Sequence, residues 1–379
     1  MKKLLHFFIR IGILFLLLGI LIMVSLFKKN PEVCESLTRG ISRFYGSIVT
    51  KVSGVVPFSL TEVFFVSIVG LGILLLIFAI INLFKLRFFK ALYRVMDIAI
   101  IALLTISVYD FSCEFAYHRK EIPLPYYQGD VLREEHINIY NYFADDLNYC
   151  VSQLEFKENG DVKTSMSLKE IANEVKKAYS IIEGDSYYHS FFGSVKPMAS
   201  SFIYREFQIT GVTFASLGEA NINTLNTQSD VPFTVAHELA HTKGVMREDD
   251  ANKLAFYVCL NSEHPYLRYA SYVAFFYQIE GMTSSYYLTD EERSELHPVN
   301  NAFYKTRSYE YQYWQDHDLL GDIGDWVNDL YIKMSGVKEG TSSYSGGTNY
   351  EHDPTTSKLI PSLYQKLFFE KYYRSKAFC

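Results

Sequence analysis

The sequence has few cysteines, and their spacing disfavours both a cysteine zinc cluster and a disulfide framework. Only five occur in 379 residues, with no C-x-x-C pair and no regular spacing. A cysteine zinc cluster and a disulfide framework both require such spacing. We therefore expect small buried side chains, and leave one long-range disulfide open. The cysteines are Cys34, Cys113, Cys150, Cys259 and Cys379.

The sequence also lacks an excess of basic residues. Its formal net charge is −6, and no long run of lysine and arginine occurs. A protein that binds nucleic acid needs a basic patch or stripe to neutralise phosphates. We therefore expect no nucleic-acid partner.

Apolar residues are abundant, but they are concentrated at the N-terminus. Three runs, Leu4–Phe27, Glu62–Phe84 and Val95–Cys113, come close to the roughly 20 residues that cross a bilayer as a helix. The first run follows two lysines, as in a signal peptide, but it is long and no small-residue cleavage site follows it. We predict a retained anchor of three spans over residues 1–118, a linker over 119–130, a domain over 131–379, and the lipid bilayer as a partner.

The basic residues beside the spans predict which way the chain is oriented. Those at the N-terminus and between the second and third runs should be cytoplasmic, which puts the domain outside the cytoplasm of a bacterial cell. The longer loop after the first run is also basic, although acidic residues partly balance it, and this favours the opposite orientation. The basic residues between the second and third runs are Lys85, Arg87, Lys90 and Arg94.

The C-terminal part has the mixed pattern of an α+β domain rich in helix. A serine followed three residues later by a glutamate predicts a capped helix over 167–182. Residues 196–225 are expected to be β structure, with strands at Phe202–Ile209 and Val212–Ala215. Further helices are expected at 132–156, 269–282, within 309–334 and at 359–373, with a loop at 340–356.

The clearest motif lies on a short apolar helix after these strands. Asp230 and Pro232 fit its start and Gly244 its end. His237 and His241 are four residues apart, so both imidazoles project from one face and can ligate one Zn²⁺ ion. The intervening Glu238 is placed to act as general base toward a water that zinc makes acidic.

A catalytic zinc site needs a third protein ligand and an open fourth position. The segment after Gly244 begins a second helix with three consecutive acidic residues. We choose Glu248 as the ligand, and composition alone leaves Asp249 and Asp250 as competitors. A metzincin site would need a histidine three residues after the glycine, where Arg247 stands.

These motifs resemble two families. His237-Glu238-Leu-Ala-His241 followed by Glu248-x-x-Ala251-Asn252 is similar to the gluzincin pattern, whose second helix supplies the third zinc ligand. The three spans and the run Arg-Glu-Asp-Asp-Ala-Asn resemble a bacterial family of membrane proteins known only as a domain of unknown function. The resemblance implies a membrane-anchored, zincin-like metallopeptidase domain; Ser342–Asp353 matches no pattern.

The predicted function is zinc-dependent hydrolysis of peptide bonds by Glu238-assisted attack of a zinc-bound water. The alternative is a metal-retaining binding or sensing module without hydrolysis. A transporter is disfavoured because the spans show no buried charge pair. The substrate, the oligomeric state and the donor to the transition-state oxyanion stay open, the candidate donors being Arg247, Arg268, His297 and Tyr331.

Overall fold

The computed structural model describes residues 2–131, 133–283, 288–334, 337–349, 351–352 and 359–377. Its contacts divide the chain into two compact units. The first comprises Met1–Lys120 together with Thr213–Glu219, and the second comprises Glu121–Val212 and Ala220–Cys379. The first unit therefore includes a short segment that lies far along the sequence from the rest of it.

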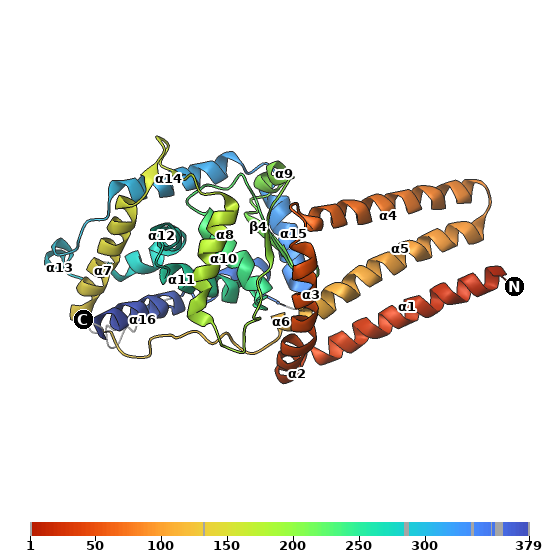
Figure 1. The fold of residues 1–379 in the computed structure, drawn as a ribbon, viewed down its shortest axis with the longest axis horizontal. Coiled ribbons are helices and arrows are strands. Elements are labelled where there is room, and N and C mark those ends of the chain that lie inside the picture. Colours follow the sequence, from red (N-terminus) through yellow and green to blue (C-terminus); the bar gives the residue numbers. More distant parts are fainter. Residues whose placement is uncertain are drawn as a thin grey trace. The chain divides into compact units, whose positions relative to one another are not determined.

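The first unit contains the expected spans. Three helices among the described residues are long and apolar enough to cross a membrane, Leu4–Phe27, Leu60–Phe84 and Phe88–Tyr117. The third is longer than the predicted Val95–Cys113, because the helix begins at Phe88 and continues through a π-helical turn (Figure 1). The elements of this unit are α1 (Lys2–Phe27), α2 (Pro31–Leu37), η1 (Thr38–Ser42), α3 (Arg43–Ser53), α4 (Leu60–Phe84), α5 (Phe88–Tyr109), η2 (Asp110–Glu114) and α6 (Phe115–Tyr117).

Ion pairs join the helices of the first unit. Arg10 Nε of α1 lies 2.8 Å from Asp97 Oδ1 of α5, and Arg94 also pairs with this carboxylate. This pair is only partly buried, with side chains 22 and 21% exposed, so it does not contradict the expectation that the spans contain no buried charge pair. The partners lie 87 residues apart in sequence, so no local pattern connects them. The loop between α4 and α5 is also shorter than expected, which places two of its predicted basic residues on α5.

The segment Thr213–Glu219 belongs to the first unit through specific contacts. The ring of Phe214 packs against Phe64 and Phe65, with centroids 5.5 and 5.1 Å away. Glu219 is fully buried, and its carboxylate accepts hydrogen bonds from the backbone N–H groups of Leu60 and Thr61. The Glu219 carboxylate thus accepts from backbone N–H groups at the N-terminus of α4 that have no partner within the helix, and its negative charge complements the helix dipole.

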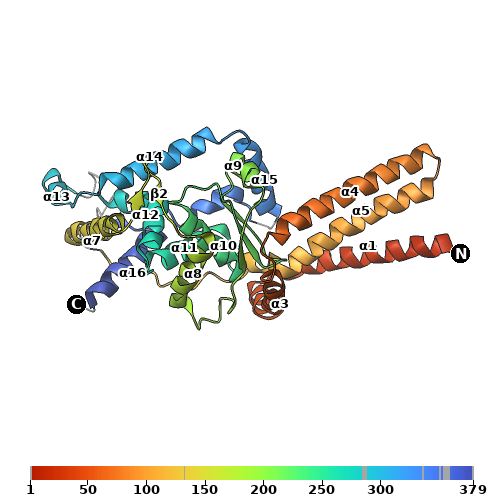
Figure 2. The ribbon, with the colours of Figure 1, turned by 45° about the horizontal axis from the view of Figure 1, so that its top comes forward.

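The second unit is rich in helix and has small sheets, so the predicted class of a membrane-anchored α+β protein is confirmed (Figure 2). The sheet with the most strands among the described residues has three, in the order β3-β5-β4, so β4 is an edge strand. The helices are α7 (Arg133–Ser152), α8 (Leu168–Ala178), η3 (Tyr179–Ile182), α9 (Ser201–Glu206), α10 (Val231–Thr242), α11 (Glu248–Leu260), α12 (Pro265–Glu280), η4 (Gly281–Thr283), α13 (Asp290–Ser294), α14 (Asn301–Asp316), α15 (Gly321–Met334), η5 (Gly340–Ser345) and α16 (Leu363–Ala377). The strands are β1 (Glu155–Phe156), β2 (Val162–Lys163), β3 (Ser194–Pro197), β4 (Gly211–Phe214), β5 (Glu219–Ile222), β6 (Glu351–His352) and β7 (Leu359–Ile360).

The core of the second unit is built around α10. Eleven of its twelve residues are buried, and it packs against α8, α11 and α12. A helix that is apolar on nearly every side is typical of a buried position. The polar side chains of α10 are therefore held in surroundings from which water is largely excluded.

Two local predictions need correction. Phe202–Ile209 is not a strand, because Ser201–Glu206 forms α9; its aromatic and branched residues favour β structure, but they do not alternate with polar ones. Asp230 occupies the N-cap position of α10 without capping it, since its carboxylate accepts a hydrogen bond from Thr234 Oγ1. The capping box at Ser167 and Glu170 is confirmed.

The four described cysteines, Cys34, Cys113, Cys150 and Cys259, are free and buried, as expected of small hydrophobic side chains. Cys379 lies outside the described residues.

Candidate metal centre

The site is built on α10 and α11, which pack against each other across a tight turn. Gly244 ends α10 with φ of +84°, a conformation that favours glycine. A Cβ atom at this position would also lie 2.8 Å from His189 Nε2. The chain therefore reverses at Gly244, and α11 begins four residues later at Glu248.

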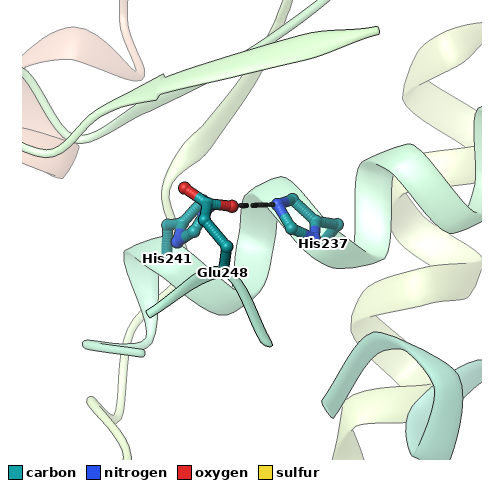
Figure 3. Close-up of side chains that lie close together, drawn as sticks. All are labelled: His237, His241 and Glu248. Atoms are coloured by element: carbon teal, nitrogen blue, oxygen red, sulfur yellow. Dashed lines mark hydrogen bonds and ion pairs between the residues drawn. The ribbon is translucent and has the colours of Figure 1, made fainter. Parts of the chain in front are cut away.

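Three side chains converge between these helices (Figure 3). The Nε2 atoms of His237 and His241 are 3.1 Å apart. Oε2 of Glu248 lies 3.1 Å from the first and 3.5 Å from the second. Each residue offers one ligand atom, and these atoms all lie within 4.8 Å of one another.

The hydrogen bonds of the two Nδ1 atoms determine that the Nε2 atoms of His237 and His241 carry the lone pairs. His237 Nδ1 is 2.8 Å from Asn252 Oδ1, and His241 Nδ1 is 2.8 Å from the carbonyl oxygen of Val245. Both partners are acceptors, so both Nδ1 atoms carry the proton in a neutral ring. The two Nε2 lone pairs then face each other and a carboxylate oxygen, an arrangement that requires a cation or a shared proton.

The charge of Glu248 has a strong effect on this cluster. Burial lowers the pKa of His241, but the charge of Glu248 and its hydrogen bond outweigh burial and raise this pKa to about 9. Burial raises the pKa of Glu248, and the two histidines more than reverse that effect and hold it well below its usual range. Without a metal ion, a proton thus takes the place of the cation.

The donor set fits a zinc ion. Ligand atoms about 2.0 to 2.2 Å from one tetrahedral ion lie about 3.3 Å from each other. The corresponding separations here are 3.1, 3.1 and 3.5 Å. Two imidazoles and a carboxylate also leave one tetrahedral position without a protein ligand, which is the composition of a catalytic site.

Glu238 follows His237 on α10 but is held apart from the three converging atoms. It is 5% exposed, and it packs against Gly211 at the start of β4. A Cβ atom at Gly211 would lie only 2.7 Å from both Cγ and Oε1 of Glu238. A glycine inside a strand often marks such a close approach. The edge strand β4 therefore fixes the position of this second carboxylate.

The next two acidic residues of α11 face other partners. Lys253 Nζ lies 3.2 Å from Asp249 Oδ2 and 2.7 Å from Asp250 Oδ1. Arg247 also pairs with both carboxylates, at 3.2 and 3.6 Å. Of the three acidic candidates, only Glu248 joins the two histidines in the cluster.

Tyr344 contributes to the site and was not expected from the sequence. It lies on η5, within the stretch Ser342–Asp353 that matched no pattern. Asn328 Nδ2 of α15 is 3.3 Å from its hydroxyl oxygen, and Asn252 Nδ2 is 3.2 Å from its carbonyl oxygen. Burial, the charge of Glu248 and that of Glu238 raise its pKa well above the ordinary value. The sequence signal for Tyr344 was weak: an aromatic residue within a Gly/Ser/Thr-rich segment.

The other candidate donors are engaged with carboxylates. Arg268 Nε lies 3.2 Å from Asp146 Oδ1, and His297 Nδ1 lies 2.8 Å from Asp145 Oδ1. Arg247 holds Asp249 and Asp250, as described above. The side chain of Tyr331 lies outside the part of the chain that the structure describes. His264 accepts a hydrogen bond from Tyr266 N at the start of α12.

Comparison with known proteins gives one match. None of the curated proteins and none of the solved structures matches the chain significantly. The family described as "Protein of unknown function (DUF3810)" matches residues 37–350, which include most of the first unit and the whole helix pair α10–α11. The match covers well over half of the sequence, and the chain therefore belongs to the DUF3810 family.

Proposed function

We propose that this chain is a membrane-bound, zinc-dependent metallopeptidase of the gluzincin type. His237, His241 and Glu248 would hold the ion, and Glu238 would act as general base. The observation that carries the proposal is the convergence of two imidazole lone pairs and one carboxylate oxygen beside a second, separately held carboxylate. A purely structural metal does not need that second carboxylate.

The chain's own residues account for the proton transfers of peptide hydrolysis. A bound zinc ion would supply Lewis acidity, which polarises a substrate carbonyl and makes a water molecule more acidic. Glu238 accepts the proton of the attacking water and delivers it to the leaving amine nitrogen as the C–N bond breaks. Buried surroundings strengthen each of these charge interactions. Water provides the oxygen of the new carboxylate, so the reaction needs no other reactant.

Two further elements support the proposal. The Tyr344 hydroxyl accepts a hydrogen bond from Asn328 and interacts with Glu248, so an O–H donor lies beside the proposed ligand, where an oxyanion would develop during attack. The edge strand β4 begins at Gly211, beside Glu238, and an extended peptide can pair with a strand at the edge of a sheet. An edge strand beside the base therefore favours a peptide over a compact small molecule as substrate.

The test uses the full-length chain purified in detergent, with zinc content and cleavage of a peptide library measured on the same samples. Wild type should hold one zinc and cleave. Glu238→Gln should keep zinc and lose cleavage, and His237→Ala should lose both. Glu158→Gln, which changes an exposed carboxylate in the turn between β1 and β2, is the matched control. Wild type without stoichiometric zinc contradicts the proposal, and zinc binding without any cleavage favours a metal-retaining sensing module.

We further propose that the second unit faces away from the cytoplasm of a bacterial cell. The basic residues at the α4–α5 loop, Lys85 and Arg87, support this orientation. A topology reporter fused after Tyr117 should be active only outside the cytoplasm. Activity of a cytoplasmic reporter at the same point would reverse the assignment.

A further inference from the structure

α15 carries an apolar stripe on the surface of the second unit. Its residues are spaced three or four apart, which places them on one side of the helix. Exposed apolar stripes of this kind on folded domains mark contact with a partner or a membrane. We call these residues the α15 stripe: Ile323, Trp326, Val327 and Leu330, with exposures of 53, 65, 51 and 45%.

The other side of α15 is fixed to the domain, so the helix cannot rotate to bury its stripe. Leu320 N donates to the carbonyl oxygen of Glu206, and a Cβ atom at Gly324 would lie 2.7 Å from the carbonyl oxygen of Phe207. Farther along the helix, Asn328 contacts Tyr344 and Ile332 is fully buried. The exposure of the stripe is therefore a property of the fold.

We infer that the α15 stripe lies in the interface of the lipid bilayer that the chain's own spans cross. Short connections join the second unit to the first unit, which contains the spans, and one of them starts from α9. The third span ends at Tyr117, four residues before the second unit begins. α9 lies beside the start of α15 (Figure 2), and only six residues lie between Glu206 and Thr213 of the first unit, so these two residues are at most about 25 Å apart.

The composition of α15 fits a bilayer interface and indicates how it binds. Tryptophan is enriched at the level of lipid headgroups, where its ring is half apolar and half polar. The exposed charges beside the stripe are mainly acidic, Asp322 and Asp325 with Lys333 farther along. Attraction to anionic lipids therefore does not drive the contact, and burial of the stripe does. This inference does not depend on whether the site hydrolyses peptides.

The test exploits the two tryptophans of the sequence, Trp314 and Trp326. In Trp314→Phe, emission reports on the stripe alone, and in the matched control Trp326→Phe it reports on α14. Each full-length variant is reconstituted in vesicles of ordinary lipid or of lipid brominated high on the acyl chains. Trp326 should lose most of its emission to brominated lipid and resist quenching by aqueous iodide, and Trp314 should lose less to brominated lipid. The circular dichroism spectra of both variants check that they fold alike.

Three outcomes overturn the inference. Quenching of Trp326 by iodide and not by brominated lipid means that the stripe faces water. Protection from both quenchers means that protein covers it, either a second copy of this chain or another partner. Quenching by brominated lipid that occurs only with anionic headgroups means that charge, and not the apolar stripe, makes the contact.

Discussion

Asn252 Oδ1 accepts a 2.8 Å hydrogen bond from His237 Nδ1, while the amide nitrogen of the same side chain donates to the backbone of η5. One side chain of α11 thus sets the tautomer of an imidazole on α10 and connects it to Tyr344. The proposed metal centre consequently depends on two adjoining helices and on η5, which lies far from them in the sequence.

Removing this hydrogen bond should weaken zinc binding. We expect Asn252→Ala to lower zinc affinity by about 10- to 100-fold, because His237 then loses the partner that fixes its ring and protonation. Asn252→Asp keeps an acceptor and should restore most of the affinity. Chelator competition on the full-length protein measures both. Equal affinities of Asn252→Ala and wild type would mean that the ring is held by other contacts.

A methyl group at Gly211 should displace Glu238, the proposed general base, and leave the proposed zinc ligands in place. The added Cβ would lie 2.7 Å from Glu238 Cγ, closer than such atoms can approach, so the side chain must move. We expect Gly211→Ala to retain zinc and to lose most peptide cleavage. Gly72→Ala, at a glycine of α4 with no atom close to an added Cβ and no positive φ, controls for the change of residue type. Loss of zinc in Gly211→Ala would instead indicate a wider distortion of the site.

Removal of the Tyr344 hydroxyl should lower the rate of peptide hydrolysis and leave zinc binding unchanged. Tyr344→Phe removes only the donor, so zinc content should stay the same while kcat falls by about 10²- to 10³-fold and KM changes little. Asn328→Ala leaves the hydroxyl in place without its partner and should cause a smaller fall. Steady-state kinetics separate these cases. An effect of Tyr344→Phe on KM alone would assign the ring to substrate binding.

Glu310 should make the stability of the protein depend on pH. Burial and the negative charge of Asp230 raise the pKa of Glu310 from 4.5 to about 8. Between these pH values the folded chain holds a proton that the unfolded chain has released, so stability falls as pH rises and levels off above about pH 8. Ser229 Oγ and Thr227 Oγ1 both donate to Oε1, an acceptor that glutamine keeps.

Glu310→Gln should therefore stabilise the protein by roughly 2 to 4 kcal/mol at about pH 8.5 and have little effect at about pH 5. Thermal unfolding of the full-length protein at the two pH values provides the measurement. A stabilisation of the same size at both values would rule out the raised pKa as its cause.

The parts of the site that the sequence could predict lie close together along the chain. His237, Glu238, His241 and Glu248 fall within twelve residues, and the spacing of helix and turn is enough to place them on two adjoining helices. Tyr344 could not be predicted, because its place depends on contacts with residues 16 and 92 positions away. Local patterns carry no information on such contacts.

For the fold too, features set by local sequence could be predicted, and features set by contacts between distant residues could not. Three long apolar runs suffice to predict three spans. The strand expected at Phe202–Ile209 failed because local β propensity competes with the packing of α9, which only the folded domain determines. The assignment of Thr213–Glu219 to the first unit has no sequence signal, since it arises from contacts such as that of Phe214 with Phe64.

That assignment determines how the protein can be dissected. A fragment cut at Glu121 would keep the β4–β5 hairpin but remove the contacts that its tip makes with α4. Phe214 would lose its aromatic packing partner on α4. The carboxylate of Glu219 would lose the backbone N–H group at the N-terminus of α4 from which it accepts a hydrogen bond. Such a fragment invites aggregation through the hairpin, and because β4 also positions Glu238, an inactive fragment would say nothing about the activity proposed for the intact chain. Biochemistry on this chain should begin with the whole polypeptide in a lipid environment.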